Sequence, residues 1–402
     1  MLFELHEKYS KPEAMMSFVL KLLQLVGIGG TGKSNWIRSI VIVTTYIVVC
    51  AVPQLFGGQP DMHHSVRASV ELIFDCNIFV GYFMLTISQA NFLTFIDELQ
   101  DLAEYACSFS FKFKNAIARF NSRMDAFART YTAVMIFIAL FYWIVPLPRT
   151  YWSYFTKLQT NTSAPLQLMQ HLEVNFYWLD NRSSMADYTV FVMIMLPITC
   201  LCSAMSSVKL LTTSSSIRYC TLFAHVTKLA VEQLDDISSK EQLPNRLFKV
   251  LSMHQRLLRC VHLLDKTLSP MLLLQWSLCV LDWSVTLLYL NYCGINLQSA
   301  TVIVMFSLIT LETFLYCVLG ALLTDKGEQL ERVLYDTRWY DLPLDVQKNL
   351  LLMLRRSQRP VRVTVGKFFQ LNLEEFGRMV NLSYSAFVVL KDQIKLDILD
   401  EV

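Results

Sequence analysis

Charged residues are scarce in this chain of 402 residues. Asp, Glu, Lys and Arg make up only 17% of it, against a hydrophobic share of 54%. So few charges could not cover the two or three soluble domains that this length would otherwise suggest. Lipid requires no polar covering, so the composition favours a membrane protein. The formal net charge of +2 gives no sign of a nucleic-acid partner.

Recognisable catalytic motifs are also missing. The chain contains no H-E-x-x-H, no G-x-S-x-G and no paired carboxylates in a plausible soluble cleft. His63 and His64 are neighbours whose side chains diverge, without a third ligand close in sequence, so a polar loop is favoured over a metal site. The sequence therefore predicts a protein that is not an enzyme and has no cofactor.

One nucleotide-binding motif is present in the wrong context. Gly27–Ser34 matches G-x-x-x-x-G-K-S, the loop that cradles phosphates between a strand and a helix. Here Met15–Val26 has the pattern of an amphipathic helix, and the residues after the motif are apolar enough to span a membrane. We interpret the motif as a glycine hinge.

Seven long apolar stretches dominate the chain. Backbone groups in hydrocarbon must bond within their own segment, so each stretch of about 20 residues predicts a spanning helix. The predicted spans are Trp36–Leu55, Val70–Leu93, Tyr131–Leu147, Tyr188–Met205, Pro270–Leu290, Ala300–Leu323 and Leu371–Leu390. The predicted fold class is therefore all-α, a polytopic membrane protein with seven transmembrane helices.

Basic residues indicate the orientation. Of the 35 Lys and Arg residues, 27 lie in the N-terminal segment and in every second connection, including those at Lys209–Lys266 and Lys326–Lys367. Such residues remain on the cytoplasmic side. The N-terminus is predicted inside and the C-terminus outside, the reverse of a G-protein-coupled receptor.

Two glycosylation sequons agree with this orientation. They begin at Asn161 and Asn181, both in the third-to-fourth connection, which is predicted to lie outside. A third sequon, at Asn381, falls within the last span and is interpreted as chance.

Helical periodicity continues beyond the fourth and fifth spans. Apolar residues recur at helical spacing on both sides of the 209–269 connection and again in Asp341–Leu354. These segments predict a helical platform under the membrane.

The seventh span is too polar to face lipid. It carries Glu374 and Arg378, spaced to pair along one helix face, and further polar residues toward Ser385. This helix must therefore lie centrally, against other helices or against water. The stripe formed by Val380, Tyr384, Phe387 and Lys391 could line a narrow pore, or the helix could simply be buried in the bundle.

The C-terminal part resembles the signature of the insect odorant receptor family. The resemblance rests on Trp339-Tyr-Asp-Leu-Pro343, on the run Lys348–Pro360, on Thr364-Val-Gly-Lys-Phe368, on Leu371-Asn-Leu-Glu-Glu-Phe376, on Asn381-Leu-Ser-Tyr-Ser385 and on Phe387-Val-Val-Leu-Lys391. It implies a tetrameric, ligand-gated, non-selective cation channel built from tuning and co-receptor subunits. The Ser-Tyr-Ser motif and the lack of a long insertion in the fourth-to-fifth connection are typical of a tuning subunit. The expected partners are the co-receptor, a small volatile ligand and the lipid bilayer of olfactory neuron dendrites.

The resemblance also implies functional regions. These are a cytoplasmic N-terminal segment (1–35), a six-helix bundle (36–323) with a cytoplasmic extension (209–269), an anchor segment (324–370), a pore helix (371–391) and an extracellular tail (392–402). An odorant pocket is expected among the second, third, fourth and sixth spans, lined by Phe74, Ile78, Ile136, Phe137, Trp143, Phe191, Met195, Met305 and Leu308. The expected pore and gate residues are Val380, Tyr384, Phe387, Leu390 and Lys391.

Three alternatives stay open. A gustatory receptor would share the topology without needing the co-receptor, but the Ser-Tyr-Ser ending argues against it. A G-protein-coupled receptor would have its N-terminus outside. A transporter would show repeated halves, which we do not find.

Overall fold

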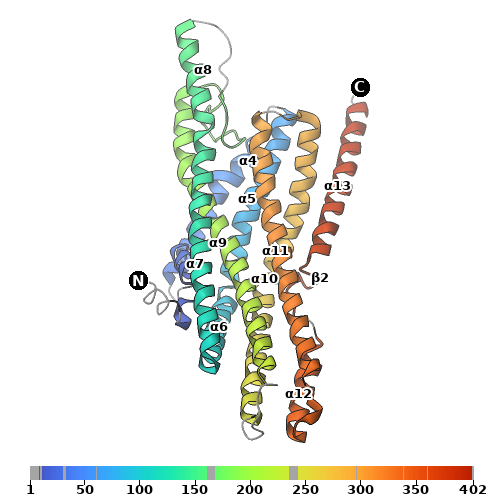
Figure 1. Ribbon diagram of the computed structural model, residues 1–402. Helices are drawn as coiled ribbons and strands as arrows, with labels where there is room; N and C mark the ends of the chain where they lie inside the picture. Colours follow the sequence, from blue (N-terminus) through green and yellow to red (C-terminus); the bar gives the residue numbers. More distant parts are fainter. Residues whose placement is uncertain are drawn as a thin grey trace.

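In the part of the chain that the structure describes, the protein is a bundle of long helices with one small hairpin (Figure 1). The computed structural model describes residues 9, 11–29, 33–59, 61–160, 168–234, 243–295, 297–337, 339–359 and 361–400. The short elements at the N-terminal end are η1 (Pro12–Ala14) and α2 (Ser17–Leu25). A helix thus precedes Gly27, as predicted, and Gly30–Gly32 of the glycine motif lie outside the described residues.

Six helices among the described residues are long and apolar enough to cross a membrane. They are the continuous run of α3 (Lys33–Tyr46), η2 (Ile47–Ala51) and α4 (Val52–Phe56), then α5 (Met62–Ile87), α7 (Phe111–Ile144) with α8 (Pro146–Thr160), α9 (Met185–Glu232), α10 (Leu243–Cys293) and α11 (Leu297–Asp336). The seventh predicted span forms most of helix α13 (Leu373–Asp400). The all-α membrane fold is confirmed, whereas the count of seven spans and the orientation stay predictions.

The second span begins earlier than its apolar pattern suggested. Helix α5 starts at Met62 rather than near Val70 and ends at Ile87, and α6 (Gln89–Phe109) follows after Ser88. Arg67 makes the first turns polar, but its side chain is buried in ion pairs with Glu71 and Glu173. Hydropathy alone therefore predicted a start for this span that lies too far along the chain.

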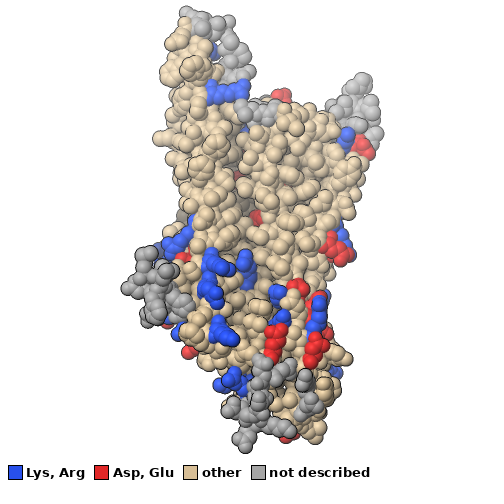
Figure 2. Space-filling view, in the orientation of Figure 1, with Lys and Arg blue, Asp and Glu red and all other residues tan. Residues whose placement is uncertain are grey.

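Helices α9 and α10 extend well beyond a bilayer. They contain 48 and 51 residues, which correspond to about 72 and 77 Å of helix against a hydrocarbon core of about 30 Å. Their predicted continuation is thus confirmed. Their far ends lie beside α12 (Leu344–Ser357), which follows η3 (Trp339–Asp341). On the face drawn in Figure 2, Lys and Arg gather over this lower half, below a broad uncharged band.

A two-stranded hairpin joins α12 to α13. Strands β1 (Thr364–Val365) and β2 (Phe369–Gln370) pair antiparallel through a turn in which Gly366 and Lys367 both have positive φ. Asp265 of α10 accepts hydrogen bonds from the backbone N–H and the hydroxyl of Thr364, both at 2.7 Å. Ser269 accepts from the backbone N–H groups of Gly366 at 3.0 Å and Lys367 at 3.1 Å. The start of α13 is therefore fixed to α10.

A buried polar network joins four helices in the middle of the bundle. Lys209 of α9 is fully buried, and its Nζ lies 3.1 Å from Glu312 Oε2 of α11. The same ammonium donates to the side chain of Asn77 in α5 and to Gln275 Oε1 of α10 at 2.8 Å. Glu312, a carboxylate within the sixth predicted span, is thus held in an interhelical contact. Lys209 was wrongly assigned to the cytoplasmic connection, since its charge is compensated inside the bundle.

Candidate functional site: an apolar cavity in the helical bundle

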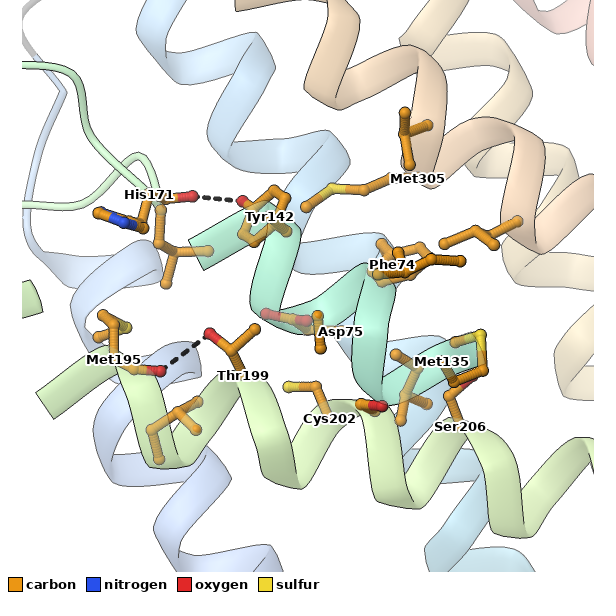
Figure 3. Close-up of a pocket in the computed structure, with 18 of the residues that line it drawn as sticks. Phe74, Asp75, Met135, Tyr142, His171, Met195, Thr199, Cys202, Ser206 and Met305 are labelled. Carbon is orange, nitrogen blue, oxygen red and sulfur yellow. Dashed lines mark hydrogen bonds between the residues drawn. The ribbon is translucent and has the colours of Figure 1, made fainter. Parts of the chain in front are cut away.

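A cavity of about 110 Å³ lies between α5, α7, α9 and α11 (Figure 3). An engineered cavity of roughly 150 Å³ accommodates benzene, so the size suits a small organic molecule. Most of its lining is apolar. The lining residues are Cys50, Phe74, Asp75, Ile78, Met135, Ile138, Ala139, Tyr142, His171, Leu172, Met195, Ile198, Thr199, Cys202, Ser203, Ser206, Val304, Met305 and Leu308.

The cavity contains five of the nine residues that the sequence assigned to a pocket. These are Phe74, Ile78, Met195, Met305 and Leu308, which come from α5, α9 and α11. The expected helices and their apolar character thus coincide with the cavity.

Helix α7 contributes a different face from the one expected. Ile136 and Phe137 are 46% and 68% exposed and lie outside the lining. The lining instead takes Met135, Ala139 and Tyr142, which are spaced by the helical repeat. This helix is apolar on both its lipid-facing and cavity-facing sides, so hydrophobicity alone could not set its rotation.

Two other expected residues lie near the cavity without lining it. Phe191 is fully buried, with its ring centroid 5.4 Å from that of Phe176. Trp143 donates its indole N–H to the Val192 carbonyl at 3.1 Å. Both pack α7, α9 and the outer loop together.

A loop covers one end of the cavity. His171 and Leu172 belong to the connection between α8 and α9, and both line the cavity. Sequence reasoning missed this contribution, because the loop has no helical periodicity. Burial lowers the pKa of His171 below its usual value, and a hydrogen bond to the Trp143 carbonyl at 2.7 Å partly opposes this effect.

Buried ion pairs hold the loop in place. Glu173 forms ion pairs with Arg67 of α5 at 3.1 Å and with Arg182 at 2.9 Å. The backbone N–H of Glu173 also donates to Glu71 at 2.6 Å, and Arg67 pairs with Glu71 at 2.9 Å. We call Arg67, Glu71, Glu173 and Arg182 the loop clamp. Because both carboxylates and Arg67 are nearly inaccessible, losing one partner would leave a buried charge uncompensated.

Asn181 helps to shape the same loop. Its side chain is 1% exposed and donates to Gln170 Oε1 at 2.9 Å and to the Val174 carbonyl at 3.0 Å. A glycan on this nitrogen would require the side chain to leave those contacts, so the geometry disfavours this predicted sequon. Asn161 lies outside the described residues.

The predicted pore stripe lies on α13, at the side of the bundle (Figure 1). This helix packs on the bundle through Glu375, Met379 and Ser383, and it leaves Tyr384 60% exposed. Leu390 is 36% exposed, whereas Val380 and Phe387 are partly buried. Lys391 Nζ lies 5.9 Å from the Phe387 ring centroid. The predicted pairing of Arg378 with Glu374 is confirmed at 2.6 Å.

Comparison with known proteins identifies the family. A family profile described as 7tm Odorant receptor matches residues 61–384, most of the chain. The chain belongs to the odorant receptor family. Among curated relatives, Odorant receptor 2a of Drosophila melanogaster is 35% identical over 88 residues, which cover 22% of each chain. The odorant receptor coreceptor of Anopheles gambiae is 25% identical over 142 residues, which cover 34% of this chain and 29% of the relative.

The fold likeness extends over nearly the whole chain. The olfactory receptor OR5 of Machilis hrabei, solved in complex with eugenol, superposes with a TM-score of 0.69 at 13% sequence identity. The superposition covers 94% of this chain and 97% of that receptor. This odorant receptor family member therefore shares its architecture with a solved insect olfactory receptor and is a multi-pass membrane protein. The two curated relatives are each matched over less than a third of their own length.

Proposed function

We propose that the chain is the odour-binding, tuning subunit of a heteromeric, ligand-gated, non-selective cation channel. The single observation that supports this most is the apolar cavity between α5, α7, α9 and α11 in a chain of the odorant receptor family. Such a cavity selects small volatile molecules by shape and desolvation. The proposed setting is the dendritic plasma membrane of olfactory sensory neurons.

The exposed side of α13 supports a pore role in an oligomer. A single chain leaves Tyr384, Val389 and Leu390 uncovered, and the start of the same helix exposes Glu374 and Arg378. Neighbouring subunits around a shared axis would enclose this face. We therefore retain Val380, Tyr384, Phe387, Leu390 and Lys391 as proposed pore and gate residues, and a tetramer with co-receptor subunits as the proposed assembly.

The distribution of charge supports the inverted orientation. The half of the molecule that carries α12 and the far ends of α9 and α10 is the more basic one in Figure 2, which suits a cytoplasmic anchor region. The loop clamp then lies at the extracellular end, where an odorant arrives. An epitope tag at the N-terminus should be reached by antibody only after the cells are permeabilised.

The deciding experiment is whole-cell current in cells that express this chain with and without the co-receptor. A panel of volatiles is applied while G-protein signalling is blocked. Rapid current only in paired cells is the expected result. Current without the co-receptor would favour the gustatory alternative. Current that disappears with the G-protein block would refute a directly gated channel.

A further inference from the structure

Asp75 is a carboxyl group inside the apolar cavity without a partner of its own. Its residue is 8% exposed and belongs to the lining. Among the described residues it has neither a hydrogen bond nor an ion pair. Arg67, two turns away on the same helix, is already held by Glu71 and Glu173. Burying an uncompensated carboxylate is costly, so the Asp75 carboxyl group on its own favours its neutral form, and a cationic ligand would supply the partner that the ionised form lacks.

Two hydroxyl groups beside Asp75 already donate their protons elsewhere. The Tyr142 hydroxyl donates its proton to the His171 carbonyl, and the Thr199 hydroxyl donates to the Met195 carbonyl at 2.9 Å. Both oxygens therefore keep only acceptor capacity toward the cavity. In Figure 3 the Asp75 side chain lies in the middle of the lining, among Tyr142, Thr199 and Cys202.

We propose that the cavity takes a small organic amine, and that Asp75 determines this specificity by binding the ammonium group. This inference rests on the proposed function and names the class of ligand. An ammonium supplies both hydrogen-bond donors and a compensating charge. An alcohol supplies one donor and no charge, and a ketone brings only an acceptor. The remaining lining, with Phe74, Ile78 and Met305, covers the hydrocarbon part of the ligand.

Binding to the purified chain tests the inference without depending on channel activity. Pentylamine, 1-pentanol and 2-pentanone have equal numbers of heavy atoms and differ in the polar group. Because a ligand that binds only the folded state raises its melting temperature, thermal unfolding gives an affinity for each compound. The expected order is amine, then alcohol, then ketone. An amine that binds no better than the ketone would overturn the inference.

Two variants distinguish the contribution of the Asp75 carboxylate to amine binding from the effect of losing any one negative charge. Asp75→Asn keeps the size of the side chain and should weaken pentylamine binding tenfold or more, while changing 1-pentanol binding less than threefold. Asp101→Asn makes the same change on α6, outside the cavity and with a side chain 64% exposed, and should match the parent chain. Unchanged amine affinity in Asp75→Asn would overturn the inference. If that variant does not fold, the ligand order in the parent chain still decides.

Currents then separate the two proposals. Amine binding with no current in paired cells that display the chain would sustain the ligand class and refute the proposed channel function. Currents evoked by 1-pentanol or 2-pentanone but not by pentylamine would refute the ligand class and sustain the channel.

Discussion

Lys209 of α9 and Glu312 of α11 form an ion pair of 3.1 Å between Nζ and Oε2, enclosed by the bundle. Asn77 and Gln275 complete the shell of the ammonium. Gly81 makes room for the lysine, since a Cβ there would lie 2.6 Å from Lys209 Cδ. The network joins α5, α9, α10 and α11 next to the cavity, because Ser206 lines the cavity one turn from Lys209.

Removing one member of this pair should be strongly destabilising. Lys209→Met leaves Glu312 buried without its cation, a change that costs about 3–5 kcal/mol. Thermal unfolding of the purified chain measures the loss. The double variant Lys209→Met with Glu312→Gln should recover most of it. Arg332→Met, which breaks an exposed pair with Glu328, should cost less than about 1 kcal/mol. Equal losses in Lys209→Met and Arg332→Met would contradict the role assigned to the buried pair.

Gly320 and Gly377 should respond oppositely to alanine. A Cβ on Gly320 would lie 2.3 Å from the Leu371 carbonyl oxygen, so Gly320→Ala must push the start of α13 away from α11 and should cost about 1–3 kcal/mol. Gly377 lies within α13 with nothing within 4 Å of its Cβ position. Gly377→Ala should leave the purified chain as stable or more stable, because alanine favours helix. A loss of current in Gly377→Ala alone would indicate a subunit contact there.

The contact between the hairpin and α10 should affect gating more than ligand affinity. Asp265→Ala removes the acceptor of both Thr364 hydrogen bonds and should reduce the maximal current, while the ligand concentration for half-maximal response changes little. Asp265→Asn keeps an acceptor oxygen and should lose less current. A large shift in that concentration with an unchanged maximum would show that the hairpin influences the cavity instead.

Two faces of α7 should behave differently toward ligands. Met135→Ala enlarges the cavity and should change the ranking of ligands by size, whereas Phe137→Ala alters an exposed surface and should leave the ranking intact. Dose–response curves for ligands of increasing length provide the measurement. The reverse outcome would restore the face of α7 that the sequence suggested.

Acid should destabilise the chain partly through His171. Burial lowers the pKa of this imidazole, so the folded chain keeps it neutral, while the unfolded chain takes up a proton below its usual pKa of about 6.5. Stability from this residue is therefore present above that pH and is lost as the pH falls below it. Melting temperatures at pH 7.5 and 5.5 should fall less in His171→Gln than in the parent chain. An identical fall in both would assign the acid sensitivity to other groups.

The sequence predicted the helices well because each must satisfy its own backbone in lipid. The helices that it expected around a pocket enclose a cavity, with Phe74 and Met305 in the lining. It could not set the rotation of α7, where lipid and cavity both select apolar side chains. Nor could it place His171, since a loop residue reaches the cavity only through the fixed path of the chain.

The sequence also failed to predict which charged residues are buried. Hydropathy predicts that Arg67 and Lys209 are exposed to water. Each is instead buried and forms an ion pair with a carboxylate from a distant segment. Asp75 could have been singled out from the sequence, because a carboxylate within a membrane span is energetically costly and indicates a functional site. The two carboxylate oxygens of Asp282, within the fifth predicted span, have no hydrogen-bond partner among the described residues.

The uncovered face of α13 bears on how such receptors are made in the cell. Leu382, Tyr384 and Val389 lie open on a helix that also exposes Glu374 and Arg378, a combination suited neither to lipid nor to water. If the proposed assembly covers this face, a chain synthesised in excess of its partner subunits would keep the face exposed to the quality-control machinery of the secretory pathway. The number of receptors at the cell surface would then follow the supply of partner subunits rather than the abundance of this chain.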